Sequence, residues 1–137
     1  MSNAATVNRG GASLPWIFAL YAAATFLHFA HNAEYLARYP NLPASWTPGE
    51  VYGAWCGVTA LGLGGYALYV FGRRKIGLMI LSLYALLGFG GLLHYTRAPM
   101  GHHSPMMNLT IRAEAAAGAL LLAKVVFLGR SRTPHSG

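Results

Sequence analysis

The sequence predicts an all-α integral membrane protein, a four-helix transmembrane bundle with both termini on the inner side of the membrane. Of its 137 residues, 55% are hydrophobic and only 9% are charged, and the mean hydropathy is +0.40. A soluble domain normally carries about 25% charged residues, and a disordered chain has low hydrophobicity. The composition therefore argues against both classes, and at this length we expect a single domain.

Four apolar stretches are long enough to cross about 30 Å of hydrocarbon, which takes about 20 residues per helix. They cover residues 14–35, 51–71, 76–95 and 107–128. Helix-breaking residues separate them: Pro40, Pro43 and Pro48 after the first, Gly72 after the second, and Pro99 and Pro105 after the third. We expect residues 1–13 and 129–137 to be flexible tails on either side of this single transmembrane domain.

The basic residues are divided unequally between the two sides that these stretches define. One side collects seven of them and no acid: Arg9, Arg73, Arg74, Lys75, Lys124, Arg130 and Arg132. The other side carries Arg38, Arg97 and Arg112, balanced by Glu34, Glu50 and Glu114. Lys and Arg gather on the cytoplasmic side of membrane proteins, so we predict cytoplasmic termini in the inner (plasma) membrane of a bacterium.

The net charge of +7 is thus explained by orientation, and we expect the lipid bilayer and no nucleic acid as a partner. Small residues such as Gly53-x-x-x-Gly57 allow transmembrane helices to approach closely. Packing within one bundle is our first interpretation of them, with a homo-oligomer or a membrane partner subunit as the alternative. Cys56 is the single cysteine and can form no disulfide within the chain.

Polar residues from three stretches fall at similar depths. A rise of 1.5 Å per residue from the inner end of each helix places His28 and Glu114 at about 21 Å, His31 at about 25 Å and His94 at about 27 Å. Titratable groups inside membrane spans are costly and usually mark functional sites. We therefore predict an outer-half site built from these four residues. Its supporting shell would hold Asn32, Arg112, His102 and His103.

A transition-metal site is the leading interpretation of this layer. Imidazole and carboxylate groups suit Zn, Cu or Fe, and the predicted ligands are His28, His31, His94 and Glu114, with His102 and His103 as weaker candidates. Haem b is a second possibility, with His28 and His94 as axial ligands from two helices.

Two other functions fit the same residues. The first is an enzyme acting on a lipid-soluble substrate, with Glu114 and His31 as candidate general acid–base groups. The second is a non-catalytic membrane subunit in which the polar layer only fixes how the helices pack. The sequence alone does not decide between these alternatives, and it contains no phosphate-binding or nucleophile-elbow motif that would add another.

Overall fold

A computed structural model describes residues 12–131, and all regular structure in this range is helical, which confirms the all-α prediction there. The four long helices are α2 (Leu14–Glu34), α3 (Pro48–Val70), α4 (Arg74–Leu87) and α6 (Pro105–Arg130). Short helical segments connect them: η1 (Leu36–Arg38), η2 (Gly90–Leu93), α5 (His94–Arg97) and η3 (Met100–His102). Most of the two predicted tails lies outside the described residues.

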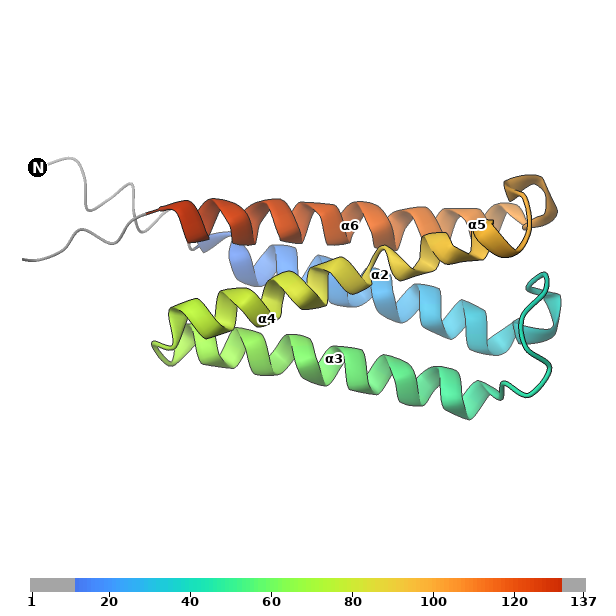
Figure 1. The fold of residues 1–137 in the computed structure, drawn as a ribbon, viewed down its shortest axis with the longest axis horizontal. Helices are drawn as coiled ribbons and strands as arrows, with labels where there is room; N and C mark the ends of the chain where they lie inside the picture. The colour runs from blue at the N-terminus through green and yellow to red at the C-terminus, as the bar shows by residue number, and fades with distance from the viewer. Residues whose placement is uncertain (1–11, 132–137) are drawn as a thin grey trace, which may run out of the picture.

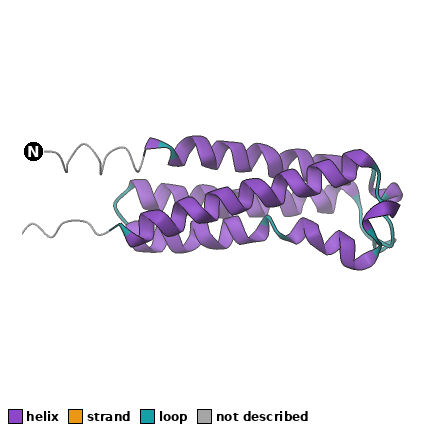
Figure 2. Cartoon of the chain, turned by 90° about the horizontal axis from the view of Figure 1, so that it is seen from above, coloured by secondary structure: helices purple, strands orange, loops and turns teal. Residues whose placement is uncertain are grey.

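The long helices lie side by side along one axis (Figure 1). The described chain starts and finishes at the same end of the bundle, which we call the terminal end and which also holds the α3–α4 turn (Figures 1 and 2). Residues 35–47 and 98–104 form the opposite end, the loop end. α2 and α4 each pack against both α3 and α6, so each long helix has two main neighbours.

The helix boundaries follow from local sequence signals. α3 starts at a capping box, in which the Thr47 hydroxyl accepts from the Glu50 amide and the Glu50 carboxylate accepts from the Thr47 amide. It is followed by Gly72 with φ +86°, a left-handed conformation that glycine adopts without steric cost. α6 starts at Ser104, whose hydroxyl caps the Met107 amide, and Pro105 occupies its first turn.

The stretch 76–95 was predicted as one continuous helix, and this is wrong. The α-helix ends at Leu87, and the chain continues through η2 before α5 begins at His94. At the break, backbone amides bond three residues back, as Phe89 does to Leu86 and Leu92 does to Phe89. Because residues three apart lie on the same face of a 3-10 helix, the tightened segment keeps Gly88, Gly91 and His94 on the inward side.

Buried residues form one stripe along α2 and another along α6. The α2 stripe, spaced by three or four residues, consists of Leu14, Phe18, Tyr21, Thr25, His28 and Asn32. Toward the terminal end the two stripes join α4 in an apolar core that includes Leu81, Tyr84 and Leu121. A smaller core of Tyr39, Met107 and Ile111 lies at the loop end. The polar residues of the stripes therefore lie between two apolar layers.

Two stretches of the described chain, Leu14–Glu34 and Arg74–Arg97, are long and apolar enough to cross a membrane. α3 and α6 have the length, but glycines and tyrosines in α3 and four charged residues in α6 lower their hydropathy: Arg112, Glu114, Lys124 and Arg130. For these two helices the predicted membrane crossing stays a prediction.

The glycines divide into two groups by their surroundings. A Cβ at Gly77 would lie 2.4 Å from the Tyr69 amide nitrogen, and one at Gly62 would lie 2.6 Å from the Tyr84 ring, so these positions hold α3 against α4. Gly53 and Gly57 have nothing within 4 Å of such a Cβ in the described structure. The Gly53-x-x-x-Gly57 pattern therefore makes no close helix contact within the bundle.

Candidate functional site

Three elements bring polar side chains into the layer between the two apolar cores. α2 contributes His28 and Asn32 from its buried stripe, α5 contributes His94, and α6 contributes Glu114. All four are buried, and Glu114 and His28 expose only 2% and 3% of their surface. The structure thus brings His28, His94 and Glu114 together in one layer.

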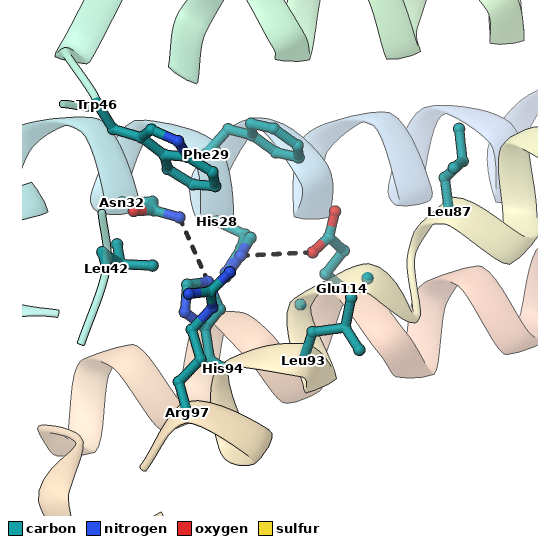
Figure 3. A pocket seen from close by; sticks show the side chains of 12 residues that line it. His28, Phe29, Asn32, Leu42, Trp46, Leu87, Leu93, His94, Arg97 and Glu114 are labelled. Atoms are coloured by element: carbon teal, nitrogen blue, oxygen red, sulfur yellow. Dashed lines mark hydrogen bonds and ion pairs between the residues drawn. The ribbon is translucent and has the colours of Figure 1, made fainter. Parts of the chain in front are cut away.

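The carboxylate of Glu114 faces the ring of His28 (Figure 3). His28 Nε2 and Glu114 Oε2 are 3.7 Å apart. Gly91 lies against this pair, because a Cβ there would be 3.0 Å from the carboxylate oxygen and 3.4 Å from His28 Nε2. The absence of a side chain at position 91 therefore leaves the space that the pair occupies.

A second polar contact joins α2 to α5. Asn32 Nδ2 lies 3.3 Å from His94 Nε2. An amide NH₂ group can only donate, so His94 Nε2 accepts and the ring proton is on Nδ1. The rings of His28 and His94 meet edge to face with centroids 5.5 Å apart, which places the two contacts in one continuous cluster.

Several polar atoms of this cluster have no hydrogen-bond partner among the described residues: Glu114 Oε2, His28 Nδ1, Asn32 Oδ1 and His94 Nδ1. Leaving a buried polar group unpaired costs about 1–3 kcal/mol, and each such group in a folded protein calls for an explanation. Four in one cluster indicate a site that binds something polar.

A cavity of about 200 Å³ lies beside the cluster. Its polar lining consists of His28, Asn32, His94, Arg97 and Glu114, and its apolar lining includes Phe29, Leu42, Trp46, Leu87 and Leu93 (Figure 3). The ring of Phe29 meets that of His28 edge to face with centroids 5.9 Å apart, and Trp46 lines the same cavity (Figure 3). An apolar pocket with a few converging polar groups is the usual form of a small-molecule site.

The loop end holds Trp46 and Arg97 near the cavity. Asn41, in a left-handed turn at φ 57°, donates to the Arg97 carbonyl at 2.8 Å, and the Arg97 guanidinium donates back to the Asn41 carbonyl at 3.3 Å. This reciprocal contact ties the loop after η1 to α5. Neither Trp46 nor Arg97 was predicted from the sequence to line the site.

A third buried imidazole extends the cluster toward the loop end. His103 exposes 5% of its surface, and its ring centroid is 6.3 Å from that of His94. Its Nδ1 donates to the Pro99 carbonyl at 3.2 Å, and its Nε2 has no partner in the described part of the chain. His28, His94 and His103 thus form a file of imidazoles that begins beside Glu114.

The structure does not bring His31 to this site. His31 is only half-buried, and its Nδ1 lies 2.9 Å from the Tyr39 hydroxyl. It lines a separate groove between α2 and α6, because the buried stripe passes from His28 to Asn32 and leaves position 31 beside it. Burial raises the pKa of Tyr39 to about 12, so its hydroxyl keeps its proton next to His31.

Two members of the predicted supporting shell are also elsewhere. Arg112 is exposed and its guanidinium contacts the sulfur of Met100. His102 is exposed on η3, whereas its neighbour His103 is buried. Both exposed residues fall outside the inward stripes, which explains why depth alone did not place them correctly.

The predicted metal centre needs a set of ligands that the described residues do not assemble. Among residues 12–131 no three His, Cys, Asp or Glu side chains are grouped so that they could hold a metal ion. Only His28 Nε2 and Glu114 Oε2 approach each other as two ligands would, while His94 Nε2 is taken by Asn32. Ligand pockets of cofactor size measure about 300–1,000 Å³ and the cavity beside His28 measures about 200 Å³; haem b stays a prediction.

The sequence matches no protein-family model, and no curated protein and no solved structure is significantly similar to it. The function must therefore be argued from the site itself.

Proposed function

We propose that this chain is a small four-span membrane protein that binds a small lipid-soluble molecule beside His28 and Glu114 and exchanges a proton with it. The observation that supports this most is the buried His28–Glu114 pair: both residues line the cavity, and Glu114 Oε2 has no hydrogen-bond partner among the described residues. The bound molecule would supply the missing partner.

The outer surface of the bundle supports a membrane location. Every long helix exposes large apolar side chains, among them Trp16 (78%), Leu63 (54%), Met79 (72%) and Leu109 (59%). Water-soluble monomers rarely expose contiguous apolar surface of this kind. We propose that all four long helices cross the bilayer, since α3 and α6 lie alongside the two stretches that are long and apolar enough to do so.

The proposed orientation follows the charges at the two ends. The terminal end carries Arg73, Arg74, Lys75 and Arg130, and the loop end carries Glu34 and Glu50 besides its arginines. By the positive-inside rule the terminal end faces the cytoplasm. The inner membrane of a bacterium is the location that we propose, with the cavity in the outer half.

His28 and Glu114 are suited to general acid–base chemistry by their type and position. Such a group must come within about 2.6–3.2 Å of the proton it transfers, or reach it through one water, and the distance is often longer before the substrate binds. The 3.7 Å between them lies just beyond that range. A hydroxyl or carbonyl group between the two side chains would bring both within hydrogen-bond distance.

The file of imidazoles provides a route for the proton between this pair and the loop end. His28 and His94 are in ring contact, and His103 follows at 6.3 Å between centroids. The apolar core below the site, which includes Leu81, Tyr84 and Leu121, contains no histidine among its described residues. We therefore propose that protons reach the site from the outer side only.

Infrared spectroscopy of the protein in lipid nanodiscs tests the proposal. The chain has no Asp and three Glu residues, so a protonated-carboxyl band can be assigned with few variants. We expect a band that changes with pH, disappears in Glu114→Gln and persists in Glu34→Gln. Glu34 is a suitable control because its carboxylate is exposed and accepts a hydrogen bond from the Tyr52 hydroxyl. His28→Gln should shift this band, because the ring is its nearest polar neighbour.

Metal analysis of the same sample separates the alternatives. Stoichiometric Zn, Cu or Fe that is lost in His28→Ala would overturn the acid–base proposal in favour of a metal centre. A Glu114 band insensitive to both pH and His28 would leave only a structural polar network.

A further inference from the structure

We propose that the molecule bound in the cavity is the single-ring head of a lipid-soluble quinone- or phenol-type compound, and that it enters from the bilayer between α2 and α3. This inference rests on the proposed function and names the class of ligand for that site. Four features of the described residues carry it.

The first feature is the size of the cavity. An apolar cavity of about 150 Å³ accepts one benzene ring. The cavity beside His28 measures about 200 Å³, which corresponds to one ring with small substituents. This size favours a single ring over larger fused-ring systems.

The second feature is the shape and chemistry of the apolar wall. The aromatic residues Phe29 and Trp46 line the cavity together with His28 (Figure 3). Aromatic side chains favour offset-stacked or edge-on contacts with another ring. Leu87 and Leu93 line the cavity as well, so a planar apolar body would meet apolar atoms on more than one side.

The third feature is the set of unpartnered polar atoms. Glu114 Oε2 and Asn32 Oδ1 accept hydrogen bonds, and the Nδ1 proton of His94 is a free donor. All three side chains are at least nine-tenths buried. A ring hydroxyl would donate to one of the acceptors, and a ring carbonyl would accept from His94. The presence of both kinds of group matches a ring that bears oxygen substituents.

The fourth feature is an opening on the side of the bundle. A second pocket of about 280 Å³ shares Phe29, Asn32 and Trp46 with the cavity and is completed by Glu50, Val51 and Ala54 of α3. It thus lies between α2 and α3, next to the space that the ring would fill. An apolar tail attached to the ring would pass through it into the lipid.

A competing route runs through the loop end. A pocket of about 680 Å³ formed by residues between Ala33 and Pro48 also touches Leu42 and Trp46. It is lined by loop residues and would admit a water-soluble molecule without a tail. The lateral route is favoured because the polar atoms face a cavity in the middle of the bundle, whose surroundings are apolar.

Fluorescence of Trp46 provides the test, since this side chain lines both the cavity and the lateral opening. The background protein carries Trp16→Phe and Trp55→Phe, so that one of the three tryptophans remains. It is titrated in lipid nanodiscs with a benzoquinone bearing a ten-carbon tail. We expect saturable quenching, and at least about tenfold weaker binding (about 1.4 kcal/mol) for an anthraquinone with the same tail.

Entrance is tested with two matched variants on α3. Ala54 lies in the lateral opening, and Ala60 is an exposed alanine on the same helix that does not line it. We expect Ala54→Phe, or Ala54→Leu if the larger change disturbs folding, to weaken or slow binding at least about tenfold. Ala60→Phe should leave binding unchanged.

The outcomes separate this inference from the proposed function. Equal binding of tailless benzoquinone, unaffected by Ala54→Phe, would overturn the lateral route. Absence of saturable quenching by any quinone, in a protein whose Glu114 infrared band still responds to pH and His28, would overturn the ligand class and leave the proposed function standing. Loss of that band's behaviour would refute the proposed function itself.

Discussion

Gly91 is the position at which a single added carbon should disable the site with the least other damage. In Gly91→Ala the new Cβ would lie 3.0 Å from Glu114 Oε2 and 3.4 Å from His28 Nε2. Non-bonded heavy atoms prefer about 3.5–4.0 Å, so the carboxylate must retreat by about 0.5–1 Å. A retreat of this size would change the His28–Glu114 separation, which is now 3.7 Å, and with it the position from which a bridging group can contact both side chains.

The energetic size of this change follows from two opposing effects. Overpacking a well-filled site costs about 1–3 kcal/mol, whereas replacing glycine by alanine in helical backbone stabilises by about 0.5–1 kcal/mol. Gly90→Ala is the matched control, because nothing lies within 4 Å of a Cβ there in the described structure. We therefore expect Gly90→Ala to be neutral or slightly stabilising and Gly91→Ala to be less stable than this control by about 1–3 kcal/mol.

The assay combines unfolding in detergent with the infrared band of Glu114 and the quenching of Trp46. For Gly91→Ala we expect a shifted band and at least about tenfold weaker quinone binding, and for Gly90→Ala neither effect. If the two variants behave alike in all three measurements, the space at Gly91 does not control the geometry of the His28–Glu114 pair.

Three further predictions concern packing, proton access and the loop end. Gly77→Ala should destabilise the bundle by about 1–3 kcal/mol while Gly53→Ala should not, because a Cβ meets the Tyr69 backbone at the first position and open space at the second; equal thermal stability of the two variants would contradict the helix contacts described. His103→Ala should slow the response of the Glu114 band to a pH jump, and His102→Ala should not, since only His103 is buried in the file of imidazoles; identical rates would exclude this route. Burial raises the pKa of Tyr39 from 10.0 to about 12. Between about pH 10 and 12 the unfolded chain therefore releases this proton while the folded chain keeps it, and the free energy of unfolding should fall as the pH rises. Tyr39→Phe should lose less stability than the wild type over this range, and parallel pH curves of the two proteins would refute the raised pKa of Tyr39.

The sequence was informative where a residue's depth and its helical periodicity agree. His28 and Glu114 were placed in one layer by counting the rise along two helices. The same counting placed His31 there too, although the buried positions of α2 are spaced to include Asn32 and to exclude residue 31. Combining depth with the spacing of Leu14, Phe18 and Tyr21 would have made this distinction from the sequence alone.

The break after Leu87 was harder to predict. Apolar composition over residues 76–95 favours a continuous helix, and propensity says little about where glycines loosen it. The sequence does contain a signal, which is the spacing of three from Gly88 to Gly91 to His94. Residues with this spacing lie on one face in a 3-10 helix but drift around an α-helix. The contacts that favour the 3-10 segment are those of Gly88 with Tyr21 and of Gly91 with Glu114, and both partners are distant in the sequence.

The cavity itself could not be predicted, because it depends on what is absent. Gly91 lines the cavity and has no side chain that would fill it. Trp46 lines it from the loop that the Asn41–Arg97 contact ties to α5. Neither fact has a local sequence signature. The number and type of polar residues in the layer were evident from the sequence, but whether they converge on a metal ion or on an open space depends on packing.

The order of the layers along the bundle decides what such a space can do. Below the cavity, Tyr21 donates to the Tyr84 carbonyl at 2.8 Å and closes the core toward the terminal end. Beside it, α3 buries Val51 and then, among its described residues, nothing fully until Gly62, so α3 contributes few buried side chains next to the cavity. A closed floor, a side with few buried α3 side chains and a file of imidazoles at the loop end give lipid-soluble molecules and protons separate routes to Glu114. A polar network that served only to fix helix packing would require neither a cavity beside Glu114 nor these routes to it.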